Sequence, residues 1–279
     1  MINLFKDLRF ILGIVILGTI LIITVLTPIL PLPDPNAMNI SCRLQPPSHV
    51  HICGTDEYGR DLLARVLVGT RTSLAISLGA TILATLSGTI VGVVSAMARS
   101  YIDLLLMRSV DLLLTFPPII VATIVVGLFG SSVVNLVLVL GILQMPGFAR
   151  LAYGATKVIQ GMPFLEAAQA IAVSKKRLLR RYILPNILSP LLVQFSITVG
   201  TAMLLESGLS FLGLGVKPPT ASLGQIIGRA RGYMAVAPSY ILFPSLLLSC
   251  LIFSCNLLGD SLRDYSDPKL LRAKNKSWR

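Results

Sequence analysis

The sequence is poor in charged residues, and poorer in acids than in bases. Only 13% of its 279 residues are charged, with 12 Asp and Glu against 24 Lys and Arg, whereas 54% are hydrophobic. In a water-soluble domain about a quarter of the residues are charged. The low charged fraction therefore excludes an ordinary soluble globular protein and indicates a chain embedded in lipid.

The sequence also lacks the usual parts of an enzyme site. It has no G-x-x-x-x-G-K-[ST] phosphate loop, which excludes ATP hydrolysis by that mechanism. Its two histidines, His49 and His51, have no nucleophile-elbow motif to serve and no zinc-type ligand spacing around them. They are better explained as part of a polar loop. We predict that the chain is not an enzyme, binds no cofactor itself and holds no metal.

The net charge of +12 would suit a nucleic-acid-binding protein if the basic residues formed one surface. Most of them instead gather in short segments beside apolar runs, which is the signal that orients membrane proteins. We therefore predict a lipid membrane as the surroundings of this chain and no nucleic-acid partner.

Six apolar runs are long enough to cross a bilayer as helices, which needs roughly 20 residues each. The first is longer than a signal-peptide core and has no convincing cleavage site, so we interpret it as an uncleaved anchor. These runs predict an all-α polytopic protein. They cover residues 10–32, 72–98, 104–130, 132–154, 189–212 and 240–262.

The basic clusters predict that both termini are cytoplasmic. Residues 157–181 contain six Lys and Arg with Glu166 as the single acid, and residues 263–279 contain six with two acids. Six spans then place residues 33–71 outside. Lys217, Arg229 and Arg231 argue mildly against this, because they would be external with no acid beside them in the sequence.

This topology divides the chain into three parts. Residues 1–71 form the anchor helix and external segment, residues 72–270 the membrane core with a cytoplasmic loop at about 156–188, and residues 271–279 a basic cytoplasmic tail. The external part contains Cys42 and Cys53, in what would be an oxidising compartment. Geometry decides whether they form a disulfide, so both states stay open.

The cytoplasmic loop contains a small-residue helix with good end signals. Pro163 suits the first helical position, the alanines from Ala167 to Ala172 favour helix, and Glu166 and Lys175 complement opposite ends of the helix dipole. A slim helix of this kind suits a groove on a partner protein. The alternative is an amphipathic helix lying on anionic lipid.

A few polar or small residues stand out within the apolar runs. Arg108 and Asp111 are three residues apart, which allows them to pair on one helix face. Glu206 has no local partner; it either lines a pathway for a cationic substrate or pairs with an Arg of a neighbouring subunit. Pro117-Pro118 should kink or break the third span, and Gly88 and Gly92 form a G-x-x-x-G that permits close helix packing.

Four motifs in order carry a family resemblance over about residues 50–270. G-T-D-x-x-G-R-D before the second span, the Glu166 loop with Leu184-Pro185-Asn186, the segment 210–220 and the segment 256–268 resemble the second, C-type permease subunit of dipeptide, oligopeptide and nickel ABC importers. As chemistry, the first motif is better explained as a tight turn leading into a helix. Its residues are Gly54, Thr55, Asp56, Gly59, Arg60 and Asp61.

The resemblance implies a type I ABC importer transmembrane domain in the bacterial inner membrane, most often for di- or oligopeptides. It implies a second homologous permease that completes the translocation pathway, two cytoplasmic ATPases that bind ATP and Mg, and an external substrate-binding protein. Glu206, Arg108 and Asp111 are candidates for that pathway. The residues expected to couple to the ATPases are Glu166, Ala167, Ala168, Ala172, Leu184 and Pro185.

Ala172 departs from the family pattern, in which the residue six after the Glu is usually Gly. Since alanine avoids the left-handed backbone that glycine allows, we expect the turn to shift or the first helix to run longer. Two alternatives for function stay open. One is an importer of the same architecture for nickel or a metal chelate; the other is a secondary transporter, which would need ion-coupling polar groups near the midplane.

Overall fold

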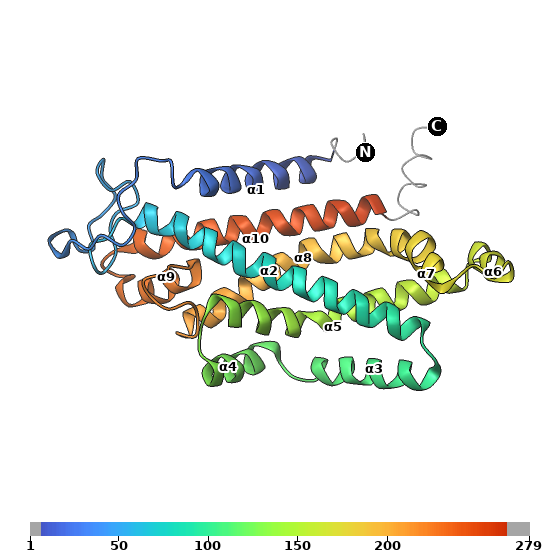
Figure 1. Cartoon of the computed structure of the whole chain (residues 1–279). Helices are drawn as coiled ribbons and strands as arrows, with labels where there is room; N and C mark the ends of the chain where they lie inside the picture. The colour runs from blue at the N-terminus through green and yellow to red at the C-terminus, as the bar shows by residue number, and fades with distance from the viewer. Residues whose placement is uncertain (1–6, 267–279) are drawn as a thin grey trace.

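A computed structural model describes residues 7–266, and every regular element in this range is helical (Figure 1). The tail and the motif residues Asp267 and Pro268 lie outside the described range. A π-helical turn, Leu179–Ile183, joins α7 to α8. The α-helices are α1 Leu8–Leu26, α2 Leu62–Met97, α3 Ser100–Leu114, α4 Pro118–Phe129, α5 Val133–Gln160, α6 Pro163–Ala170, α7 Lys175–Leu178, α8 Leu184–Phe211, α9 Leu223–Ala230 and α10 Pro238–Ser266.

The polytopic, all-α expectation is confirmed. Within residues 7–266, five helices are long and apolar enough to cross a membrane: α1, α2, α5, α7–α8 together, and α10. The predicted third span is instead broken into α3 and α4, which meet at 87°. Pro117 and Pro118 cause the break, since Pro118 begins α4 and the residue before a proline avoids helical geometry. Counting this bent pair as one span gives six.

The long helices lie side by side, with the cytoplasmic loop at one end of the bundle (Figure 1). At the other end lie residues 33–61, which we call the external cap. Arg9 near the start of α1 pairs with Asp264 near the end of α10, with Nη2 and Oδ2 2.6 Å apart. Both helix ends therefore lie on the same side, at the end that carries α6. This arrangement agrees with the predicted N-in, C-in topology.

The helix that follows the external motif continues into the second span. It begins directly after Asp61 and runs on without a break, so α2 is one helix of 36 residues. Its length of about 54 Å, at 1.5 Å per residue, exceeds the hydrocarbon core of about 30 Å. The first turns of α2 therefore project into the cap, and residues 72–97, which carry no charge, provide the span.

Close packing of α2 on α5 forms the centre of the bundle. A Cβ built on Gly88 would lie 2.5 Å from the carbonyl oxygen of Met145, and one on Gly92 would lie 2.2 Å from that of Ala149. No side chain fits at either position without moving the backbone. The G-x-x-x-G motif thus brings two spans into backbone contact, as the spacing predicts.

Gly92→Ala is expected to lower the unfolding temperature of the detergent-solubilised protein, because the added methyl must push α5 away, at a cost of about 1–3 kcal/mol. Gly127→Ala is the matched control: it lies in α4, and no other group comes within 4 Å of the point where its Cβ would lie. The control should match the wild type or gain slightly from the helix preference of alanine. Equal melting temperatures for the two variants would contradict this account of α2–α5 packing.

Candidate functional site

The cytoplasmic loop forms a compact helix–turn–helix. Pro163 begins α6, as the sequence predicts, and the helix ends at Ala170. The chain then turns at Ala172, whose φ is +55°, and the N–H of Val173 donates to the carbonyl of Ala168 at 3.1 Å. That bond is the 6→1 bond of a Schellman-type helix end.

The expectation for Ala172 is wrong on both counts. The first helix does not run longer and the turn does not shift, because Ala172 itself adopts the left-handed backbone. The surrounding contacts over-determine this conformation: Leu165 and Ala168 anchor α6 before the turn, and Val173 packs on the same apolar cluster after it. An alanine in this backbone region costs about 1 kcal/mol relative to glycine.

α6 is attached to the ends of α5 and α8 through one narrow face. Leu165 and Ala168, three residues apart and so on one side of the helix, are 1% and 5% exposed. They enter a cluster that includes Ile159 at the end of α5 and Ile187 at the start of α8. Through these contacts, a displacement of α6 would also displace the ends of α5 and α8.

The opposite face of α6 is free in this chain. Glu166, Ala167 and Ala170 are exposed, and Ile171 is 78% exposed. Leu184 and Pro185 are also exposed, at the start of α8. We call these exposed residues the loop surface; they are Glu166, Ala167, Ala170, Ile171, Leu184 and Pro185.

The loop surface differs from the predicted coupling set at two positions. Ala168 is buried against its own chain, where it holds α6 in position. Ala172 forms the turn. Ile171 was missed, although a large apolar residue at the end of an alanine-rich helix is a signal the sequence does carry.

The external motif is a folded structural cap instead of a chemical site. Asp56 is fully buried; its Oδ1 accepts from the N–H groups of Tyr58 (2.9 Å) and Arg60 (3.0 Å), and its Oδ2 lies 2.6 Å from Arg60 Nε. Asp61 caps α2 by accepting from the N–H of Ala64 at 2.8 Å. Its other oxygen contacts His51 Nδ1 at 2.9 Å.

The remaining motif residues close the backbone of the cap. Thr55 donates to the carbonyl of Cys42 at 2.5 Å and accepts from the N–H of Gln45 at 2.8 Å. Gly54 and Gly59 have positive φ values of 85° and 73°. A Cβ on Gly59 would lie 1.7 Å from the carbonyl oxygen of Asn39, so only glycine fits there.

The cap also supplies an acidic partner for Arg229, one of the basic residues that argued against the predicted topology. Arg229 of α9 has no acid near it in the sequence, but its Nη1 lies 3.1 Å from Glu57 Oε1. The hydroxyl of Tyr240, in α10, donates to the same carboxylate. Glu57 thereby ties the external segment to α9 and α10.

Cys42 and Cys53 are free thiols, so no disulfide closes the external segment. Cys53 is buried in the apolar cluster with Leu62 and Val66. The sulfur of Cys42 instead accepts from Asn39 Nδ2 at 3.3 Å. Burial, with a smaller contribution from the Asp61 carboxylate, raises the pKa of the Cys53 thiol.

Alkylation is expected to distinguish the two external cysteines. Because the raised pKa keeps Cys53 protonated at neutral pH and only the thiolate reacts, a water-soluble maleimide should label Cys42 well before Cys53 in the folded protein. Peptide mass spectrometry measures both rates. Denaturation should make them equal, and a cross-linked peptide pair two hydrogens lighter would contradict the free-thiol state.

Glu206 satisfies neither of its two expectations. It is fully buried inside this chain, where Ser73 Oγ donates to Oε2 at 2.9 Å and Ser210 Oγ donates to Oε1 at 2.7 Å. Ser73 in turn accepts from the N–H of Leu223 at 3.1 Å. The carboxylate therefore joins α2, α8 and α9 within the subunit and is not exposed at the surface of this chain.

The expected pair within the third span is also wrong. Asp111 forms its ion pair with Arg150 of α5 instead of with Arg108, which is exposed. Nearby, Asp103 accepts from Ser95 Oγ at 2.7 Å and Tyr153 Oη at 3.0 Å. Most apolar side chains of α3 are exposed, so little apolar packing holds this helix in place. The polar contacts of Asp103 and Asp111 attach α3 to α2 and α5.

The fold defines a class of membrane protein: a bundle of long apolar helices with a short helical loop at one end. Structures of the MetNI methionine ABC transporter in inward-facing conformations share it, with a TM-score of 0.60 at 20% identity, covering 74% of this chain and 96% of that chain. An amino acid ABC transporter gives a TM-score of 0.51 at 16% identity, covering 75% and 94%.

Sequence comparison then shows the family. The family described as "Binding-protein-dependent transport system inner membrane component" matches residues 88–272. A peptide transport system permease protein of Brucella abortus is 37% identical over 96% of this chain and 90% of its own length. Glutathione transport system permease proteins GsiD of Pectobacterium atrosepticum and Escherichia coli are 38% and 40% identical over 80% of this chain and 74% of theirs. The chain belongs to this family of ABC importer permeases, as the motifs predict, which rules out the secondary transporter.

Ala172→Gly is expected to stabilise the protein by about 1 kcal/mol, since glycine adopts the left-handed backbone without strain. Ala167→Gly is the matched control, because Ala167 is exposed and lies inside α6; it should destabilise by about 0.5–1 kcal/mol. Thermal unfolding of the two variants in detergent measures both effects. A loss of stability in Ala172→Gly would contradict the assigned turn.

Proposed function

We propose that this chain is one of two permease subunits of an ATP-driven importer of short peptides in the bacterial inner membrane. The carrying observation is the loop surface, a charged and slim helix face that is free in this chain while its other face is fixed to α5 and α8. The names of the relatives support the substrate class: one set is named for peptides, and glutathione is itself a small peptide.

In this proposal the partners divide the work. Two cytoplasmic ATPases bind ATP and Mg and hydrolyse ATP, while this chain binds no cofactor and is not an enzyme. Each ATPase receives a helix such as α6 in a groove, the recognition mode that suits a slim helix. A second permease completes the translocation pathway, and an external binding protein delivers the peptide at the end formed by the cap and α9.

The packing of α6 provides a mechanical route for coupling. When the ATPases close, they move α6, and Leu165 and Ala168 pass this movement to the cytoplasmic ends of α5 and α8. Because α5 is packed against α2 through backbone contacts, these helices move together as a unit. The pathway then alternates between outward-open and inward-open states.

Nickel or a metal chelate is the other cargo considered, and within residues 7–266 no cluster of three or more His, Cys, Asp or Glu residues favours it. His51, half of the histidine pair in the external segment, is engaged with Asp61. Cargo selection by the binding protein would leave the permease architecture unchanged. A peptide remains the cargo that the names of the relatives support.

Glu166→Lys is expected to leave the fold intact and to reduce ATP-driven uptake of a labelled dipeptide at least about tenfold. Reversing a charge in a docked interface costs about 2–5 kcal/mol, and Glu166 is exposed in this chain. The measurement uses the tagged chain purified with its partners and reconstituted with the binding protein in vesicles, following ATP hydrolysis and uptake in parallel.

Asp260→Lys is the matched control, because it makes the same charge change on an exposed residue of α10, outside the loop surface. It should transport as the wild type does. Normal uptake by Glu166→Lys would overturn the coupling role. Recovery of the wild-type chain without an ATPase, in a detergent that keeps another ABC complex intact, would overturn the partner assignment.

A further inference from the structure

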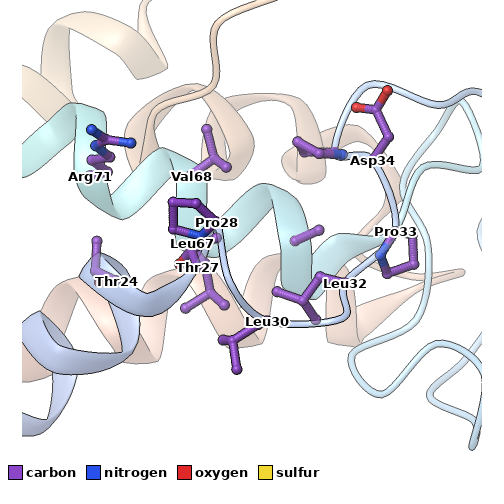
Figure 2. Close-up of a pocket in the computed structure, with 12 residues that line it drawn as sticks. Thr24, Thr27, Pro28, Leu30, Leu32, Pro33, Asp34, Leu67, Val68 and Arg71 are labelled. Atoms are coloured by element: carbon purple, nitrogen blue, oxygen red, sulfur yellow. The ribbon is translucent and has the colours of Figure 1, made fainter.

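A cavity of about 370 Å³ lies between the end of α1, the segment 27–35 and the first turns of α2 (Figure 2). Its volume falls within the range of small-molecule sites, roughly 300–1,000 Å³. The end of α1 and the start of α2, which line it, lie at the end of the bundle opposite α6 (Figure 1). The lining residues are Thr24, Thr27, Pro28, Leu30, Leu32, Pro33, Asp34, Pro35, Ala64, Leu67, Val68 and Arg71.

The polar groups of the cavity stand at its two ends. Figure 2 shows Arg71 and Thr24 at one end and Asp34 at the other, with Leu30 and Leu67 between them. Within residues 7–266, Arg71 makes no salt bridge. Thr24 is 3% exposed, and its hydroxyl has no hydrogen-bond partner.

A buried hydroxyl without a partner is uncommon, because burying a polar group unpaired costs free energy. Thr24 could bond back to the carbonyl one turn earlier, as Thr27 does to Ile23 at 3.1 Å, but it does not. An unsatisfied hydroxyl and an unpaired guanidinium at one end of a cavity are complementary to an anionic oxygen group such as a phosphate.

The sequence places this cavity at the boundary between lipid and water. Arg71 is the last charged residue before the uncharged stretch 72–97, and Asp34 is the first charged residue after Arg9. Beside the cavity, Val25 and Ile29 are 72% and 79% exposed, as side chains that face lipid are. A ligand there lies at the depth of lipid headgroups on the external side.

We propose that this cavity binds a zwitterionic aminophospholipid of the outer leaflet. The phosphate lies on Arg71 and Thr24, the ammonium is directed towards Asp34, and the ethanolamine carbons between them lie against Leu30 and Leu67. The glycerol and acyl chains leave the phosphate on the side of the exposed Val25 and Ile29. Asp34 disfavours a purely anionic lipid, because a second negative charge would be repelled. A bound lipid would fill the space between the end of α1 and α2. This role is separate from the proposed transport function.

A short peptide also carries an ammonium and an anionic group, so it is the competing ligand class. The apolar wall and the lipid-facing neighbours Val25 and Ile29 favour the phospholipid. A peptide on the transport route would not need a site between α1 and α2 at the boundary between lipid and water.

Native mass spectrometry of the purified complex tests the proposal, with phosphatidylethanolamine or phosphatidylglycerol added to the detergent. The wild type should retain phosphatidylethanolamine preferentially. Arg71→Gln should weaken its binding about tenfold, the loss expected for one charge-assisted hydrogen bond of about 1.5 kcal/mol. Asp34→Asn should reverse the preference towards phosphatidylglycerol.

Lys217→Gln is the matched control, because Lys217 is an exposed external cation that does not line the cavity; it should bind lipid as the wild type does. Equal retention by Arg71→Gln and the wild type would overturn the site. Displacement of the lipid by inorganic phosphate would make the ligand a free anion, and recovery of a peptide instead of a lipid would overturn the lipid class.

Discussion

The architecture depends on the backbone contact between α2 and α5. In lipid, apolar side chains gain little by leaving one hydrocarbon environment for another, so helices associate through close packing and polar contacts. Gly88 and Gly92 allow α5 to approach within a distance that no side chain would permit. The two helices connect the ends of the molecule, because α2 begins in the external cap and α5 ends at the cytoplasmic loop. A movement at either end is therefore passed to α2 and α5 together, as one rigid unit.

Buried polar contacts fix the position of the external cap and of the helices around Glu206. In the cap, Asp56 is fully buried against Arg60, and Glu57 reaches α9 and α10. In the bundle, Glu206 accepts hydrogen bonds from serines of two helices. A buried ion pair adds little net stability over an apolar replacement, but losing one partner is costly. Such groups fit the cap and the bundle together in one arrangement.

The two ends of the molecule are built for different tasks. In the cap, the carboxylates of Asp56 and Asp61 accept hydrogen bonds from groups within or directly after the motif. The motif residues therefore bind one another. The cytoplasmic loop is attached through one face and open on the other, so its free groups are available to a partner. A distinctive sequence motif is thus structural in the external cap and suited to docking in the cytoplasmic loop. The two motifs differ in whether their polar groups are bonded within the chain or exposed.

Local chemistry let the sequence alone predict the long apolar helices, the start of α6 at Pro163 and the break before Pro118. Run length, charge clusters and a missing N–H act over a few residues, so they can be read from the chain. The tertiary structure decided the contacts of Asp111 with Arg150, of Glu206 with Ser73 and of Glu57 with Arg229, which are 39, 133 and 172 residues apart in the sequence. It also decided the left-handed Ala172, because packing on both sides of the turn outweighs the backbone preference of a single alanine.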